Sequence, residues 1–295
     1  MVETKHIPVM LEEVLGVLNV SAGKVYIDAT VGGGGFSREI LKRSSPDGTL
    51  IGLDRDAQSL EKAEEELEKD FDKKRFYLFH LNFNRIDEAV RSAGFNVVDG
   101  IVLDLGISSI QLEGGRGFSF KEEGFLDMRM DRDEEITAFK IINDYPEKVI
   151  ADILWKYGNE RFSRRIARKI VEYRKKKPVE TPVELSEIIN KAVFRGKKNY
   201  KIDNSTRTFM ALRIAVNKEY ESLQGCLEKI KGILVSKGII AIISFHSGED
   251  RIVKNFFRND PDFRPVFKKL MYPSEKEIKI NPRSRSAKLR AFYHV

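Results

Sequence analysis

The chain has 295 residues, 41% of them hydrophobic and 33% charged, with a formal net charge of +7 and a pI near 9.2. This length allows one α/β domain, alone or with a smaller second domain, and the basic balance favours a polyanionic partner such as nucleic acid. A single cysteine, Cys226, excludes an internal disulfide framework, and four scattered histidines argue against a metal site. Without a signal peptide or a membrane-spanning run, we expect a cytoplasmic protein with no membrane partner.

Short β-branched runs alternate with helical patterns over the first hundred or so residues. The elements expected there, in chain order, are strand 24–28, helix 36–43, strand 49–54, helix 57–71, strand 75–79, helix 84–93 and strand 100–104. Repeated strand-then-helix units of this length predict a parallel, doubly wound sheet.

The alternation stops after the fourth strand, and the next ninety or so residues show helical periodicity and no convincing strand. The pattern then resumes with a long helix 208–234, strand 238–244, helix 249–257 and β-like runs 266–271 and 289–295. The economical interpretation is one α/β domain, residues 1–112 and 208–295, split by an all-helical insert at 113–207. We expect this insert to recognise the substrate.

A glycine run follows the first strand and opens a helix. Backbone N–H groups in such a turn can approach a nucleotide-like ligand closely. A dinucleotide fingerprint starting at Gly32 or Gly33 would need a further glycine where Ser37 and Arg38 stand. Asp28 within the first strand and Asp54 at the end of the second instead favour a methyltransferase, with Asp54 accepting hydrogen bonds from ribose hydroxyls. A glycine-rich turn without a ligand is the alternative.

The fourth strand ends at Asp104 and is followed by Ser108 and Ser109. Open α/β sheets bind ligands near this point. Amino-methyltransferases usually place an acidic or amide group here with a proline pair, which this chain lacks. Our hypothesis is that Asp104 holds the cofactor or polarises an exocyclic amine, with Ser108 and Ser109 available to the base. The alternative is a buried aspartate that caps a turn.

Two basic clusters lie in the predicted insert. The amphipathic stretch 160–174 has apolar residues on one face and mostly arginine and lysine on the other, and a second cluster covers 195–201. Such faces can neutralise phosphates, although a solvated helix face is the simpler explanation for either one alone. Phe118 and Phe120 could stack on a flipped base, or could pack in the core.

The motifs resemble those of the RsmH (MraW) family, the 16S ribosomal RNA cytosine-N4 methyltransferases, over almost the whole chain. The matching stretches are His6–Leu11, Tyr26–Gly35, Leu53–Asp56, Leu103–Ser109, Arg116–Phe120, Leu126–Asp131, Ser205–Phe209, Ile243–Ser247, Glu249–Lys254 and Asn281–Ser286.

This resemblance implies a Rossmann-like fold with a mostly parallel seven-stranded sheet and an inserted helical domain. It also implies methyl transfer from S-adenosylmethionine to a P-site cytidine of 16S ribosomal RNA in the 30S subunit or a late precursor, with no metal; a homodimer stays open. The implied cofactor contacts are Gly33, Gly34, Gly35, Phe36, Asp54, Phe83, Asp104 and Gln111. Members often carry histidine at position 36 and another residue, such as arginine, at position 33.

Three other functions stay open on the sequence. A nicotinamide- or flavin-dependent oxidoreductase is disfavoured by the missing third glycine. An amino-methyltransferase acting on DNA or a small molecule is disfavoured by the basic insert and the proline-free fourth-strand motif. A non-catalytic RNA-binding assembly factor would bind RNA without binding the cofactor.

Overall fold

The computed structural model describes residues 8–193 and 203–295, and the chain divides into two compact units. The sheet unit comprises Met1–Ser109 and Tyr220–Val295, and the helical unit is Ile110–Glu219. The division falls at 110 and 219, outside the boundaries of 113 and 207 inferred from the sequence. The reason is that α10 (Ser205–Asn217) packs against α7 (Glu147–Gly158) within the helical unit.

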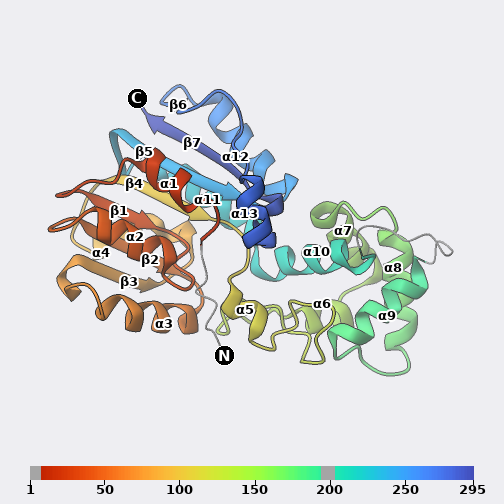
Figure 1. Ribbon diagram of the computed structural model, residues 1–295. Helices are drawn as coiled ribbons and strands as arrows, with labels where there is room; N and C mark the ends of the chain where they lie inside the picture. The colour runs from red at the N-terminus through yellow and green to blue at the C-terminus, as the bar shows by residue number, and fades with distance from the viewer. Residues whose placement is uncertain (1–7, 194–202) are drawn as a thin grey trace. The chain divides into compact units, whose positions relative to one another are not determined.

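The sheet unit is built on a seven-stranded sheet with the order β3-β2-β1-β4-β5-β7-β6 (Figure 1). Its strands are β1 (Val25–Asp28), β2 (Thr49–Asp54), β3 (Phe76–His80), β4 (Val98–Asp104), β5 (Leu234–Ser244), β6 (Phe263–Pro265) and β7 (Lys288–His294). β1 to β5 run parallel, and β7 is antiparallel to both of its neighbours. The predicted mostly parallel, Rossmann-like sheet is confirmed.

Helices cover both faces of this sheet (Figure 1). One face carries α1 (Leu11–Leu18), α2 (Gly35–Arg43) and α3 (Ala57–Glu68); the other carries α4 (Ile86–Ser92), α11 (Glu219–Ile230) and α12 (Ser247–Asn259). Successive residues of a strand point to opposite faces. Tyr26 accordingly lies in the core with α1 and α2, while Ile27 lies in the core with α4 and α11. Burial on both faces explains why the central strands are continuous apolar runs.

Shorter elements complete the sheet unit. They are η1 (Lys73–Arg75), η2 (Phe83–Arg85), α13 (Glu275–Ile280) and η3 (Pro282–Ser286). α13 was not predicted. It begins at Ser274, whose hydroxyl accepts a hydrogen bond from the N–H of Glu277.

The helical unit contains no strand within its described residues, as predicted. Its helices are α5 (Ser109–Glu113), which begins at the boundary, α6 (Ala138–Asp144), α7, α8 (Ser163–Arg174), α9 (Pro182–Ala192) and α10. α8 buries Ile166 and Ile170 and exposes Arg164, Arg165 and Arg168, in agreement with the predicted amphipathic pattern. Phe118 is buried and Phe120 makes an edge-to-face contact with Phe209, which supports core packing for both rings.

Two expectations for the C-terminal half are wrong. The single helix 208–234 is two helices, since Lys218 adopts a left-handed φ of 48° between α10 and α11 and β5 already begins at Leu234. The run 266–271 forms no regular strand. Strand β6 lies earlier, at 263–265. The run itself makes a hydrogen bond from the N–H of Val266 to the carbonyl of Ala291 and an isolated bridge between Met271 and Leu289.

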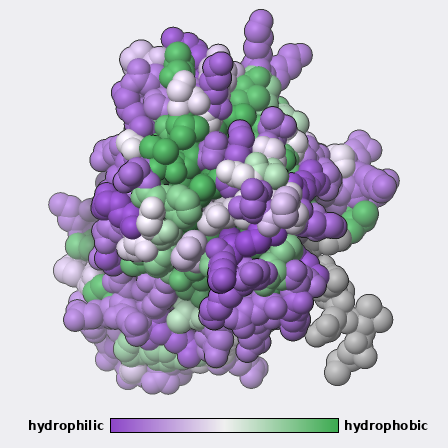
Figure 2. All heavy atoms as spheres, turned by 90° about the vertical axis from the view of Figure 1, so that its left-hand side faces the viewer, coloured by the Kyte–Doolittle hydropathy of each residue, from purple (hydrophilic) through white to green (hydrophobic). Residues whose placement is uncertain are grey.

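The surface agrees with a sequence rich in charged residues. Hydrophilic side chains cover most of the face in Figure 2, with smaller hydrophobic patches between them. Within the described ranges, no helix is both long enough and apolar enough to cross a membrane.

Candidate active site

Three neighbouring strands each end in an aspartate. β1 ends at Asp28, β2 at Asp54 and β4 at Asp104, and β1 lies between the other two in the sheet. Since the three strands are parallel, these carboxylates lie along one edge of the sheet. The strand order reverses between β1 and β4, so this edge contains the switch point where open α/β sheets bind ligands.

The glycine run forms a tight turn between β1 and α2. The N–H of Gly34 donates to the carbonyl of Val31 at 2.8 Å, and Gly34 has a left-handed φ of 80°. A Cβ added to Gly35 would lie 2.4 Å from Cγ of Pro8, whereas one added to Gly33 would meet nothing within 4 Å. The turn is therefore closely packed at its end and open at Gly33, where a ligand or a larger side chain can be accommodated.

Asp54 fastens this turn to β2. Its Oδ2 accepts a hydrogen bond of 2.7 Å from the N–H of Gly32, and its Oδ1 accepts one of 2.9 Å from the N–H of Asp56. Burial raises the pKa of Asp54 to about 6, against the lowering effect of these two donors. Because each carboxylate oxygen can accept more than one hydrogen bond, Asp54 retains capacity for hydroxyl donors of a ligand.

Asp28 has a structural role that the sequence analysis did not assign. Its side chain is fully buried, and its two oxygens accept hydrogen bonds from the hydroxyl of Ser37 at 2.7 Å and the N–H of Thr30 at 3.2 Å. Burial raises the pKa of Asp28 to about 6. Asp28 thus connects the end of β1 to the first turn of α2.

Asp104 differs from the other two aspartates in its hydrogen bonding. Its backbone N–H donates to Oγ1 of Thr30 at 2.7 Å, but its carboxylate Oδ1 is enclosed and has no hydrogen-bond partner among the described residues. Burial raises the pKa of Asp104 well above its usual range, and the nearby carboxylates of Asp28 and Glu249 raise it further. Buried carboxylate oxygens normally accept a hydrogen bond, and a donor group of a ligand would supply the one that Oδ1 lacks.

The remaining predicted residues fall into three groups. Ser108 lies beside the turn, because a Cβ on Gly32 would be 3.7 Å from its Cβ. Phe83 is half-buried in η2 and packs against the core, and the Phe36 side chain is buried among α1 and α2, which leaves only the backbone of Phe36 for a ligand. Gln111 is buried on α5 in the helical unit, and the side chain of Ser109 lies outside the described residues.

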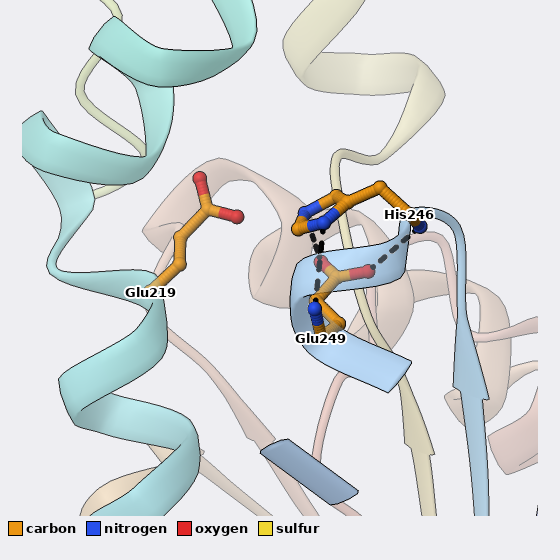
Figure 3. Close-up of side chains that lie close together, drawn as sticks. All are labelled: Glu219, His246 and Glu249. Carbon is orange, nitrogen blue, oxygen red and sulfur yellow. Dashed lines mark hydrogen bonds and ion pairs between the residues drawn. The ribbon is translucent and has the colours of Figure 1, made fainter. Parts of the chain in front are cut away.

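The sequence analysis missed a further buried carboxylate, Glu249, in the first turn of α12, the helix that follows β5. Oε2 of Glu249 accepts hydrogen bonds from the N–H groups of Phe245 at 2.9 Å and His246 at 3.3 Å, and its Oε1 lies 3.1 Å from Nε2 of His246. Figure 3 shows the contacts between His246 and Glu249 at the first turn of α12, where Nδ1 of His246 also accepts from the N–H of Glu249. The spacing of a capping box, with glutamate at the third helical position, was the available signal.

Comparisons with known proteins identify the family of this chain. The sequence pattern of the MraW methylase family matches residues 3–295. The chain belongs to the MraW methylase family. It is 44% identical over 98% of its length, and 98% of the relative, to "Ribosomal RNA small subunit methyltransferase H" of Clostridium botulinum (strain Kyoto / Type A2). It is 45% identical to the protein of the same name from Sulfurihydrogenibium sp. (strain YO3AOP1), over 97% of this chain and 98% of the relative.

A solved structure supports the fold alone. A proposed rRNA-methylase from Clostridium thermocellum superposes with a TM-score of 0.51 at 12% identity, covering 98% of this chain and 100% of that chain. Membership of the MraW methylase family makes this chain a methyltransferase whose cofactor is S-adenosylmethionine. The sequence-based assignments of family, enzyme class and cofactor are confirmed.

The residues present fit this cofactor. Gly33 opens into free space, Asp54 can accept hydroxyl donors, and Asp104 Oδ1 lacks a donor among the described residues. An uncompensated acceptor suits a cofactor that is positively charged and carries an ammonium group, since a cation beside Asp104 would favour its ionised form. When bound, S-adenosylmethionine supplies a methyl group activated by its sulfonium. The protein has to align the acceptor and exclude water.

Proposed function

We propose that this protein transfers a methyl group from S-adenosylmethionine to the exocyclic N4 of a cytidine in the P-site region of 16S ribosomal RNA. The names of the relatives support ribosomal RNA of the small subunit as the acceptor, and the proposal places the reaction in the cytoplasm. The observation that carries the proposal is the enclosed, unpartnered Oδ1 of Asp104, within the described residues, at the switch point of a methyltransferase sheet.

Asp104 acts on the target amine or on the cofactor. As a carboxylate it accepts a hydrogen bond from the exocyclic amine, which opposes delocalisation of the nitrogen lone pair into the ring and makes the nitrogen more nucleophilic. As nitrogen gains the methyl group it becomes more acidic, and the same carboxylate can take its proton. In this proposal Ser108, which lies beside the glycine turn, contacts the base. A paired cytidine must first leave its stack to reach this edge.

The helical unit supplies an RNA-binding surface in this proposal. Arg164 and Arg165 are exposed on α8, on the side away from its buried residues, and neither has an acidic partner among the described residues. Arg168 is 3.9 Å from Glu147 and Lys169 is 2.6 Å from Glu172, so those two charges are partly neutralised. The other predicted basic cluster, 195–201, lies outside the described residues.

The test is transfer of labelled methyl groups to 30S particles and to naked 16S ribosomal RNA, both from a strain lacking the enzyme, followed by nucleoside mass spectrometry. We expect N4-methylcytidine, with the assembled or nearly assembled particle as the better substrate. Asp104→Ala serves as the matched inactive variant. Label in another nucleoside would overturn the choice of target atom. No label with intact cofactor binding would overturn the choice of acceptor.

A further inference from the structure

α12 carries a row of exposed cations that starts near the carboxyl ends of the parallel strands, where Asp104 lies. The helix begins at Ser247, directly after β5, and β5 pairs with β4 so that Ile243 lies opposite Asp104. Val253 and Phe257 face the core. Arg251, Lys254 and Arg258 are exposed, and their spacing of three and seven residues places them on one face of the helix.

The far end of this row borders a cavity of about 370 Å³ at the β6 edge of the sheet, where α12, β6 and β7 lie together (Figure 1). Lys254 and Arg258 line it, together with Lys268 and Lys269 from the segment after β6. Phe257 and Phe292 also line it, and their rings stack with centroids 3.9 Å apart. The cavity therefore has a packed aromatic wall and a rim of flexible cations.

Acidic side chains nearby are already engaged by other cations. Asp250 lies 2.7 Å from Arg290 and 3.6 Å from Lys288, and Asp260 and Asp262 both contact Lys231. This leaves a set of exposed cations without acidic partners among the described residues, which we name the cation track. It consists of Arg251, Lys254, Arg258, Lys268 and Lys269.

We propose that the cation track binds the phosphodiester backbone of the RNA that flanks the target nucleotide. A row of unpaired positive charges running from the active-site edge into a cavity matches a chain of phosphates, which needs charge and spacing rather than base-specific donors. The inference rests on the proposed function and deepens it. It places a second RNA contact on the sheet unit, separate from the arginines of α8.

The test compares Lys254→Glu/Arg258→Glu with Lys62→Glu/Lys74→Glu in the full-length protein. All four side chains are exposed, the charge change is equal, and the control pair lies on α3 and η1 near β3, at the opposite edge of the sheet from β6. Binding to a 16S ribosomal RNA transcript is measured by fluorescence anisotropy over a range of salt concentrations. Thermal unfolding and S-adenosylmethionine affinity are measured for both variants.

We expect the track variant to bind at least about tenfold more weakly than the control. The slope of log K against log salt should fall by about one for each phosphate that the variant no longer neutralises. Lys254→Gln/Arg258→Gln should lose less affinity in the same direction, with cofactor affinity unchanged in all variants. Equal RNA binding by the track and control variants would overturn this inference alone. Failure of the unmodified protein to methylate ribosomal RNA, whether naked or in 30S particles, would overturn the proposed function as well.

Discussion

The backbone N–H of Asp104, at the end of β4, donates a 2.7 Å hydrogen bond to Oγ1 of Thr30, in the loop after β1. This bond joins the loop after β1 to the end of β4, on either side of the switch point. The side chain of Thr30 therefore fixes the backbone position of Asp104. The glycine turn and the carboxylate of Asp104 are thereby held in a fixed position relative to each other.

Thr30→Val removes the acceptor while keeping the shape of the side chain. The N–H of Asp104 would then lack its partner, at a cost of about 1–3 kcal/mol in the free energy of unfolding. Because a small displacement of a reacting group slows catalysis strongly, we expect methyl transfer to fall roughly 10²-fold. Thr30→Ser, which retains the hydroxyl, should behave nearly as the unmodified protein. Equal turnover in the two variants would show that this bond does not position Asp104.

Asp104→Asn tests the charge at the proposed reactive group. The amide has nearly the same shape but cannot take a proton, so we expect turnover to fall roughly 10²-fold or more. The raised pKa of Asp104 adds a pH signature. Turnover of the unmodified protein should rise with pH as Asp104 ionises, and the low residual turnover of the variant should lack that limb. A pH–rate profile at saturating cofactor distinguishes the unmodified protein from the variant. An unchanged rising limb in Asp104→Asn would mean that another group causes the pH dependence.

Glu249→Gln is expected to shift the rising limb of the pH–rate profile that we assign to Asp104. The carboxylate of Glu249 is one cause of the raised pKa of Asp104, so its removal should lower that pKa and shift the rising limb of the pH–rate profile to lower pH. Gln keeps an acceptor for the N–H groups of Phe245 and His246. Asp250→Asn, next along α12, controls for loss of a neighbouring charge. A limb that stays in place in Glu249→Gln would mean that the two carboxylates do not interact.

Gly35→Ala and Gly33→Ala form a matched pair within the glycine turn. An added methyl group at Gly35 would overlap the ring of Pro8, so this variant should lose about 1–3 kcal/mol in the free energy of unfolding. A methyl group at Gly33 meets open space, and its effect should stay within about 0.5 kcal/mol. Urea unfolding curves measure both. Similar stabilities would contradict the close packing of Pro8 on the turn.

The strand ends were predictable because each signal is local. β-Branched runs ending at Asp28, Asp54 and Asp104 predicted three strands of a parallel sheet, and the position of Asp104 at the end of its strand indicated the switch point. The break at Lys218 was not predictable. No proline or glycine marks the break, and the interactions found beside it are tertiary contacts rather than local ones. The amide of Asn217 donates to the carbonyl of Met128, and its oxygen accepts from the N–H of Met130.

The direction in which a side chain points was the other feature that the sequence could not predict. Phe36 is the second residue of α2, next to the glycine turn, and its side chain lies in the core because that helix packs against α1. The pairing of His246 with Glu249 was hidden because histidine is an unusual N-cap residue, although glutamate stands at the expected spacing. Both cases depend on contacts that periodicity does not describe.

Asp28→Asn should make the protein more stable at neutral pH. The folded state raises the pKa of Asp28 from 3.8 to about 6, so between these values it binds more protons than the unfolded state, and stability falls as pH rises through that window. By pH 7 the loss is up to about 3 kcal/mol, which asparagine avoids while it can still pair with Ser37 and Thr30. Urea unfolding from pH 4 to pH 7 should therefore show the variant gaining on the unmodified protein. Asp152→Asn, at an exposed site on α7, controls for the charge change, and parallel curves for Asp28→Asn and the unmodified protein would contradict the prediction.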